Sequence, residues 1–591
     1  MPNLLPFVLW GAAAWSAPAD PPVRPPPPAA PIVVRFPEEG ASLPPLSAVF
    51  VNGAVSDPKA GFSINGMRVK PHRTGGFIAY VPVSSGTFGL ECLLELAGGT
   101  KTLTRTVAVA GRPAPLPPGP PAIEASGLEP SADLELMAED WLQAQFRGSP
   151  GHEAAFRTGR RRWLPMAETG PGLYQGAVQV REEDFPEPGE LHFRLSGSGG
   201  PDASVPSAGK VVVRSGPSAV AAARSDEPFN VRSGLGAGYL LFPLPGTRFL
   251  TSGRAGRMTR LALAPGFEGW VETDKLEPLP PGTPPPAGRL RSVSTAAGPD
   301  ASFVRLGLTE KVPFIVEPGA SLDSLTLRLF HTAVDADWVV YDSSETLVRE
   351  VRWRVLGGGA AEVTVSFKAP ARLWGWGVAW EEGGLRLELR RPPRIPRTGS
   401  VFAGRSVVLD PGHGPLAPGA VGPTGVLEAD VNFGITRQLE RMLKAEGAAV
   451  TLTRQRNEDV SLAERARLAR LARPDLFVSI HNNNLNEAAN PFAYPHGYSV
   501  FYYHPHSMDL ARRVHRSFQR SIPLQDERLR FGDLFMARVS EAPAVLVEGA
   551  YMSYPEQEEL LVQPDFQRRM AKAVLEGMRD FLASERRRQA P

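Results

Sequence analysis

The chain has 591 residues, of which 64 are Lys or Arg and 62 are Asp or Glu, and its net charge at pH 7 is +2. This length is too great for a single domain, and the balance of charges argues against a dedicated nucleic-acid-binding protein. The sequence contains one cysteine, Cys92, which excludes an internal disulfide and a cysteine-based metal cluster.

The N-terminal segment indicates export. Residues 4–15 form an apolar run, and Ser16-Ala17-Pro18 follows it as a zone of small residues suited to cleavage. The run is too short to anchor a chain stably across a bilayer. We therefore expect residues 1–17 to be a signal peptide and residues 18–31 a proline-rich spacer. The mature chain should have no transmembrane anchor and should reside in the periplasm or cell envelope.

The chain up to about residue 393 is predicted to be a series of β modules. Short runs of β-branched and aromatic residues alternate with Gly, Pro, Asn and Ser, which is typical of strands joined by turns. Segments rich in Pro and Gly divide these runs into groups. We predict an immunoglobulin-like sandwich over residues 32–110, a second β-rich domain over 122–216, a small SH3-like barrel over 228–278, and a further β-rich domain over 290–393.

Three tryptophans near the end of the last β module share one face of a predicted strand. Trp374, Trp376 and Trp380 are separated by even numbers of residues, and side chains alternate between the two faces of a strand. Indole rings in such a stripe can stack on sugars. We favour the simpler interpretation, in which the stripe faces the core of its own module.

The last third of the chain alternates strand-like and helix-like segments. Val431, Ile435, Leu439 and Leu443 recur at helical spacing and predict a helix over residues 431–446 that stops at Gly447. Other helices are predicted over residues 462–473, 507–521 and 566–582, and strands over 449–453 and 498–503. This alternation implies an α/β domain over residues 400–585, with a mostly parallel sheet covered by helices on both faces.

Three buried strands of this region end on, or just before, a residue that can bind a metal or carry a proton. These residues are His413, His481 and Glu548. Chemistry in open α/β sheets collects beyond the carboxyl ends of the strands, so we expect all three at one edge of one sheet. Glu428, on the loop between the first strand and the first helix, can fold back over that edge.

Two imidazoles and one carboxylate form a three-ligand set for a catalytic zinc ion, with a fourth position for water. The second carboxylate, if it is not a ligand, can take the proton from that water. Taken alone, a histidine at a strand end is more often a structural residue, and a glutamate in a loop is usually solvated. An unpaired carboxylate at the end of an apolar strand, as at Glu548, is costly and harder to explain without a function.

Several ordered motifs in this region match one known family. They are Leu409-Asp410-Pro411-Gly412-His413-Gly414, Glu428 followed by Asp430-Val431-Asn432, Leu452-Thr453-Arg454, Ser479-Ile480-His481 with Asn483, and Pro543-Ala544-Val545-Leu546-Val547-Glu548. Over the last third of the chain the sequence resembles the zinc-dependent N-acetylmuramoyl-L-alanine amidases of bacterial cell-wall turnover. Ala429, Asn482, Tyr551 and Tyr554 depart from the residues common in that family.

The resemblance implies a role for each matched site residue. His413, Glu428 and His481 would bind one Zn²⁺ ion per catalytic domain, and Glu548 would be the general base or acid. We also expect Asn483 and Arg454 to contact the substrate. The departures from the family pattern remove no ligand, so they bear on the fit of the substrate rather than on metal binding.

The resemblance also implies the reaction. We expect a peptidoglycan hydrolase that cleaves the amide bond between N-acetylmuramic acid and the L-alanine of the stem peptide, using water activated by zinc. The β module over residues 290–393 is similar to the amidase-associated targeting domain. Peptidoglycan is the expected partner, nucleic acid is not, and we expect a monomer. Two alternatives stay open: a non-catalytic peptidoglycan-binding protein with a degenerate amidase fold, and a zinc peptidase that acts on stem peptides.

The connection after His481 is short. Residues 482–496 separate that strand end from the next predicted strand. A loop of about fifteen residues holds little more than a turn or two of helix, so a long helical insert over the metal site is not expected. The sequence therefore predicts an open site.

Overall fold

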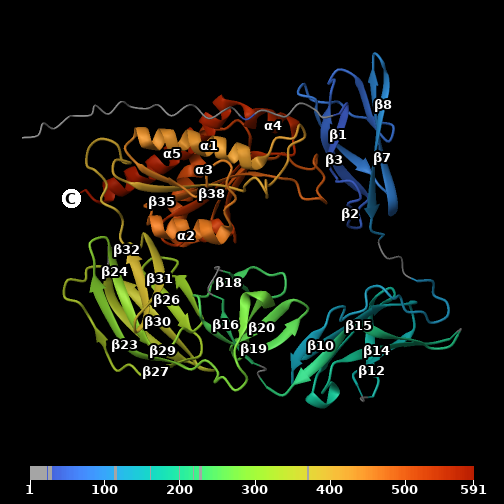
Figure 1. Cartoon of the computed structure of the whole chain (residues 1–591), viewed down its shortest axis with the longest axis horizontal. Coiled ribbons are helices and arrows are strands. Elements are labelled where there is room, and N and C mark those ends of the chain that lie inside the picture. The colour runs from blue at the N-terminus through green and yellow to red at the C-terminus, as the bar shows by residue number, and fades with distance from the viewer. Residues whose placement is uncertain are drawn as a thin grey trace, which may run out of the picture.

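The computed structural model describes residue 23 and residues 30–111, 116–159, 162–198, 200–216, 219–224, 229–368 and 372–590. The predicted signal peptide and most of the predicted spacer lie outside the described residues. No helix in these ranges is long and apolar enough to cross a membrane. The described chain consists of β modules in its first two thirds and of an α/β domain in its last third (Figure 1).

The first module is a two-sheet β sandwich, called here the N-terminal sandwich. One sheet has the order β1 (Ile32–Phe36), β3 (Ala48–Val55), β6 (Gly76–Pro82). The other has the order β2 (Ser42–Leu43), β8 (Gly99–Val109), β7 (Gly86–Leu96), β4 (Gly61–Ile64), β5 (Met67–Arg68). Alternate residues of both sheets fill one core, which includes Cys92, so the cysteine is buried as a small apolar side chain.

The next two β-rich segments share one hydrogen-bonded sheet. Its first part contains β10 (Trp141–Arg147), β11 (Glu153–Arg157), β12 (Leu164–Gly170), β13 (Leu173–Gln179), β14 (Gly189–Ser196) and β15 (Ala203–Arg214). Its second part contains β16 (Ala219–Ala223), β17 (Val231–Arg232), β18 (Tyr239–Leu241), β19 (Arg248–Ala255), β20 (Met258–Ala264), β21 (Phe267–Glu272) and β22 (Leu276–Pro278). Strand β9 (Leu134–Met137) joins the parts, because it pairs with both β15 and β19.

The fourth module is formed by two more sheets. The first contains β23 (Gly288–Ala297), β24 (Ala301–Leu308), β27 (Thr332–Val334), β28 (Val339–Val340), β31 (Gly375–Glu381) and β32 (Gly384–Arg390). The second contains β25 (Phe314–Pro318), β26 (Ser324–Leu329), β29 (Val348–Leu356) and β30 (Ala360–Phe367). Leucine and valine side chains from both sheets form one core.

The α/β domain has a six-stranded sheet with the order β34-β33-β35-β38-β36-β37. The strands are β33 (Ser406–Pro411), β34 (Ala449–Leu452), β35 (Leu476–Asn483), β36 (Gly497–Tyr502), β37 (Gln525–Phe531) and β38 (Ala544–Tyr551). All neighbouring pairs are parallel except β36 with β38. The mostly parallel sheet expected from the sequence is therefore confirmed.

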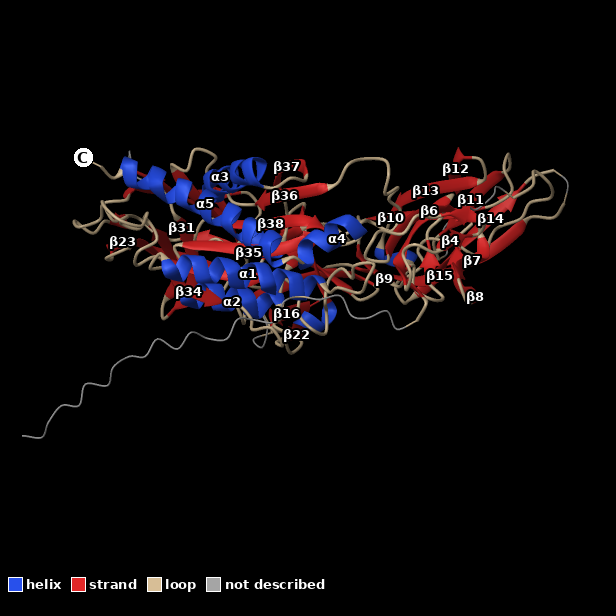
Figure 2. Cartoon of the chain, turned by 90° about the horizontal axis from the view of Figure 1, so that it is seen from above, coloured by secondary structure: helices blue, strands red, loops and turns tan. Residues whose placement is uncertain are grey.

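Helices cover both faces of this sheet (Figures 1 and 2). Helices α1 (Glu428–Ala445), α3 (Met508–Ser521), α4 (Pro555–Val562) and α5 (Pro564–Arg588) belong to this domain, as does α2 (Leu462–Ala472). Figure 1 shows α1, α3 and α5 on one side of β35 and β38, with α2 on the other. Along β33, Val407 and Leu409 enter the core below α1, and Val408 enters the core on the α2 side. Successive side chains of one strand are thus buried on opposite faces.

Several elements of the α/β domain differ from the sequence prediction, among them α1, β37 and α4. Helix α1 begins at Glu428 rather than at residue 431, so Glu428 lies in the first helical turn and not on the preceding loop. A carboxylate is favourable there because the N-terminus of a helix carries partial positive charge. Strand β37 and helix α4 were not predicted. Strand β37 lies at the sheet edge and is largely polar, so it lacks the alternating pattern of a half-buried strand.

The fourth β module is fixed to the α/β domain through Trp374. Its indole N–H donates to the backbone oxygen of Asp475 at 2.8 Å, and its ring packs on Phe581 with centroids 5.2 Å apart. Trp374 is therefore part of the α/β core, and the prediction that it faces its own module is wrong. That prediction is confirmed for Trp376 and Trp380, which pack against the core of their module. Trp374 differs because it precedes β31 rather than lying in it.

Replacing Trp374 tests this attachment. The side chain is 4% exposed, and a buried Trp→Ala change costs about 3–5 kcal/mol. We expect Trp374→Ala to lower the calorimetric melting temperature of the α/β domain by roughly 6 °C or more. Trp338→Ala is the matched control, because Trp338 is 69% exposed, and its melting temperature should stay close to that of the wild type. Equal melting temperatures for Trp374→Ala and the wild type would contradict the attachment.

Candidate metal centre

The structure brings His413, Glu428 and His481 together at the carboxyl end of the central strands. His413 follows β33, His481 lies in β35, and Glu428 opens α1 above them. The Nε2 atom of His413 lies 3.3 Å from Oε2 of Glu428, and Nδ1 of His481 lies 3.3 Å from Oε1. One nitrogen or oxygen of each residue lies within 4.8 Å of the others. These three residues are called the metal group below.

The metal group fits a zinc ion. A tetrahedral ion with ligand distances of about 2.0–2.2 Å separates its ligand atoms by about 3.3–3.6 Å. Each histidine nitrogen lies 3.3 Å from one oxygen of Glu428, His413 from Oε2 and His481 from Oε1, so each separation is at the lower end of this range. Two imidazoles and a carboxylate are also among the donor sets of catalytic zinc sites. The residues present are therefore suited to hold the ion.

Glu428 is held as a carboxylate although it is buried. Burial alone would raise its pKa, but hydrogen bonds from His413 and His481 hold the pKa well below its usual range. The backbone N–H groups of Ala420 and Asn482 donate to its two oxygens at 2.9 and 3.1 Å. Asn432, one turn further along α1, donates from its amide at 3.0 Å. The carboxylate is thus oriented by donors on several sides.

The surroundings of His481 favour the protonated form of its imidazole. Burial alone would lower the pKa of its imidazole, but the hydrogen bond with Glu428 and the charge of Glu548 raise the pKa to about 8. A bound cation must displace this proton, so metal binding is coupled to proton release.

Glycines make room for the metal group. A Cβ atom at Gly412 would lie 2.2 Å from the ring of His481, and one at Gly419 would lie 2.3 Å from Oε2 of Glu428. Neither position can carry a larger residue without moving a ligand. His413 itself has a φ of 62°, in the left-handed region that a histidine seldom adopts. Its conformation must be stabilised by its surroundings.

A buried ion pair supplies that stabilisation. Arg465 of α2 donates to the backbone oxygens of Pro411 and His413, both at 2.6 Å, and to Oδ1 of Asp410 at 2.9 Å. Asp410 is fully buried, and hydroxyls of Thr453 and Ser479 also donate to it. Burial alone would raise the pKa of Asp410, but Arg465 and these hydroxyls lower it. The turn that carries His413 is therefore tied to a charged network.

Arg454 belongs to the same network and does not face a substrate. Its guanidinium is buried and donates to the backbone oxygens of Pro411, Gly412 and Ala429 at 2.8–3.0 Å. Its donors are thus directed at the chain that carries the metal group. The expectation that Arg454 contacts the substrate is replaced by a role in positioning this turn. Asn483, half-buried at the end of β35, stays a predicted substrate contact.

Glu548 lies beside the metal group on the next strand. It is the register partner of His481 in the parallel pair β35–β38. Its Oε2 atom is buried and has no hydrogen-bond partner among the described residues. Burial raises the pKa of Glu548 to about 8, and the charge of Glu428 acts in the same direction. The turn after β38 thus does not satisfy this oxygen, which leaves it available to a proton.

The remaining histidines of the domain lie elsewhere. His515 pairs with Asp526 at 2.7 Å, and His496 lies 3.7 Å from Glu527. His504 and His506 are buried and stack on each other. None of these four joins the metal group in the described part of the chain.

The loop after β35 leaves the site accessible. Between Asn483 and Gly497 the structure contains turns but no helix, as its length predicted. The side chain of His413 is 34% exposed and that of His481 is 17% exposed. Solvent can therefore reach the metal group.

Comparisons with known proteins agree with this arrangement. Residues 407–580 match the family model for N-acetylmuramoyl-L-alanine amidase. The chain is 31% identical over 174 residues to N-acetylmuramoyl-L-alanine amidase LytC of Bacillus subtilis, a match that covers 29% of this chain and 35% of LytC. It is 31% identical over 183 residues to the probable cell wall amidase LytH of Staphylococcus aureus, covering 31% of this chain and 60% of LytH.

A solved structure also matches the last third of the chain. N-acetylmuramoyl-L-alanine amidase AmiC2 of Nostoc punctiforme is 31% identical, with a TM-score of 0.29, over 31% of this chain and 99% of that structure. The chain spans about a third of LytC and less than two thirds of LytH, so the similarity concerns one domain. Residues 407–580 therefore form a domain that matches the N-acetylmuramoyl-L-alanine amidase family.

Proposed function

We propose that the protein is an exported peptidoglycan hydrolase that cleaves the amide bond between N-acetylmuramic acid and L-alanine of the stem peptide. The observation that carries the proposal is the metal group with an unpartnered carboxylate on the neighbouring strand, inside a domain of the amidase family. His413, Glu428 and His481 would hold one Zn²⁺ ion. When bound, this ion would polarise the amide carbonyl and lower the pKa of a water molecule.

Glu548 would move the proton in this reaction. Amide hydrolysis breaks the bond between the carbonyl carbon and nitrogen, and the nitrogen must gain a proton before it leaves. A carboxylate next to the attacking water can accept its proton and pass it to that nitrogen. Glu548 is suited to this role because Oε2 has no other partner and because burial raises the pKa to about 8. The pKa of Glu548 is thus closer to neutral pH than the pKa of an exposed glutamate.

The two other functions make different demands on the site. A non-catalytic wall-binding protein has no need for a buried carboxylate without a hydrogen-bond partner beside a metal group, because such a carboxylate destabilises the fold. A zinc peptidase would use the same metal chemistry on a different amide bond. Mass spectrometry of the products released from purified peptidoglycan separates these functions. Intact stem peptides with a free N-terminal L-alanine support the amidase, whereas shortened stem peptides support the peptidase.

The metal assignment predicts the metal content of the full chain. We expect one zinc ion per chain by elemental analysis, and neither zinc nor activity in His413→Ala, which loses one of three ligands. His515→Ala is the matched control, because His515 pairs with Asp526 and lies outside the metal group. It should keep its zinc. A zinc-free preparation that hydrolyses peptidoglycan at the wild-type rate would contradict the assignment.

The proton-transfer role predicts the effect of Glu548→Gln. Loss of a general acid or base typically lowers the rate about 10²–10⁴-fold. We expect this loss in kcat, with zinc content and melting temperature unchanged, because glutamine has nearly the same shape and cannot shuttle the proton. A variant that releases its zinc would show that Glu548 is a ligand. A variant that loses its fold would show a structural role.

A further inference from the structure

The N-terminal sandwich is seated directly on the α/β domain. Arg73 forms a bidentate pair with Glu559 of α4, with nitrogen–oxygen distances of 2.7–3.0 Å. Phe50 of β3 is buried against Leu485, Tyr551 and Tyr554. The sandwich therefore contacts both α4 and the loop that follows the metal ligand His481.

The contact between the two domains also includes the segment that precedes Glu428. A Cβ atom at Gly76 of β6 would lie 3.1 Å from Cβ of Pro555 and 3.3 Å from Cβ of Pro423. Glu558 of α4 in turn accepts hydrogen bonds from the backbone and hydroxyl of Thr424 at 2.8–3.1 Å. The two domains thus meet at elements that surround the metal group.

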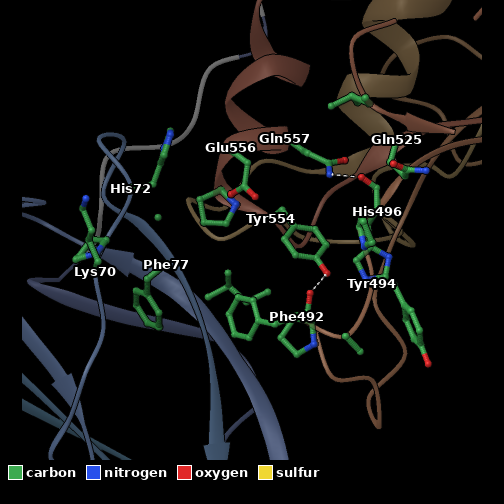
Figure 3. Close-up of a pocket in the computed structure, with 18 of the residues that line it drawn as sticks. Lys70, His72, Phe77, Phe492, Tyr494, His496, Gln525, Tyr554, Glu556 and Gln557 are labelled. Carbon is green, nitrogen blue, oxygen red and sulfur yellow. Dashed lines mark hydrogen bonds between the residues drawn. The ribbon is translucent and has the colours of Figure 1, made fainter. Parts of the chain in front are cut away.

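A cleft of about 980 Å³ remains open between the two domains, next to this contact (Figure 3). Residues 70–72 and 76–78 of the sandwich line one wall, and residues 491–496, 523–525 and 554–557 line the other. The volume is at the upper end of the range of ligand sites. Figure 3 shows Lys70, His72 and Phe77 on the sandwich side and Phe492 and Tyr554 on the other side, with the Tyr494 ring further out and directed away from the sandwich. We call this space the interdomain cleft.

The wall on the α/β side is well ordered by its own contacts. The Tyr554 hydroxyl donates to the backbone oxygen of Pro491 at 2.7 Å, and the Gln557 amide donates to that of His496 at 2.9 Å. The ring of His496 packs on both Tyr551 and Tyr554, with centroids 4.8 and 5.2 Å away, and the two tyrosine rings also contact each other. The loop is thereby held in place beneath its exposed side chains.

The interdomain cleft is connected to the metal group through β38. Tyr551, against which the cleft residue His496 packs, follows Glu548 by three residues in β38. Three residues of extended strand span roughly 10 Å. The strand that carries Glu548 therefore also supports the α/β wall of the cleft.

The side chains exposed in the cleft suit a saccharide. Phe492 is 63% exposed and Tyr494 is 73% exposed, and aromatic faces bind the apolar C–H faces of sugar rings. Lys70 and Glu556, on opposite walls, are exposed and have no hydrogen bond or ion pair within the described ranges, so both are available to hydroxyl and acetamido groups.

We propose that the interdomain cleft is a second binding site, built jointly by the N-terminal sandwich and the α/β domain, for the glycan strand of peptidoglycan next to the amide that is cut. The proposal rests on the proposed function for the identity of the polymer. The sandwich would thereby add saccharide contacts that the catalytic domain lacks on its own, and these contacts would favour polymer over small muramoyl peptides.

Binding without turnover tests the site separately from the reaction. The probe is a soluble oligosaccharide of alternating N-acetylglucosamine and N-acetylmuramic acid without stem peptides, and the dissociation constant is measured by calorimetry on the full chain. We expect Phe492→Ala/Tyr494→Ala to weaken binding about tenfold, because the variant loses both exposed aromatic rings that would stack on sugars. Trp338→Ala, which removes an exposed aromatic far along the chain, should bind as the wild type does.

Lys70→Ala tests the sandwich wall of the cleft. Loss of one hydrogen-bonding group should weaken binding about threefold. Unchanged binding by Lys70→Ala would overturn the joint site and confine the saccharide contacts to the loop. Unchanged binding by the double aromatic variant would overturn the site altogether. Equal or tighter binding of a free stem peptide, dependent on Phe492 and Tyr494, would show a peptide site instead.

Kinetics give the second readout. In the double aromatic variant we expect KM for polymeric peptidoglycan to rise about tenfold, with kcat and the kcat/KM for a monomeric muramoyl peptide unchanged. An equal loss on both substrates would place these residues in the catalytic site and overturn the proposal. If the wild type binds the oligosaccharide but cleaves neither substrate, the amidase assignment fails and the saccharide site stands.

Discussion

The buried pair of Asp410 and Arg465 is the interaction on which the metal centre depends. Asp410 ends the apolar part of β33, where an isolated carboxylate would be strongly disfavoured, and Arg465 from α2 compensates its charge. The same guanidinium donates to the backbone oxygens of Pro411 and His413. Arg465 thus joins helix α2 to His413, the residue of the metal group whose backbone is in the left-handed region.

This network holds the turn and the helix that carry the metal group in place. Arg454 adds donors to the same turn, and Asn432 holds Glu428 from within α1. Burial lowers the pKa of Arg454 to about 10, which still leaves it charged at neutral pH. Arg454 therefore keeps its charge near neutral pH. The hydrogen bonds from Arg454 to the backbone of Pro411 and Gly412 are therefore kept near neutral pH.

The elements that place the site could be predicted from the sequence because their signals are local. Apolar runs ending in His481 and Glu548 define two strand ends, and the parallel topology brings both to one edge. The roles of Arg454 and Arg465 could not be predicted in this way. Each bonds to backbone oxygens more than twenty residues away, which depends on the packing of helices and strands and not on spacing along the chain. Asp410, between an apolar strand and Pro411-Gly412, indicates that a buried positively charged side chain must lie nearby, but its position in the sequence does not say which one.

The contact between the sandwich and the α/β domain could not be predicted from the sequence either, although two residues at the contact are unusual for the family. Tyr551 and Tyr554 depart from the family pattern, and both lie in the cluster that receives Phe50. A catalytic domain that works alone has no need for these large apolar faces on the loop side of its site. Their burial beneath Phe50 couples the position of the sandwich to β38, the strand that carries Glu548. The first β module is therefore packed against the α/β domain at the end of the strand that carries Glu548.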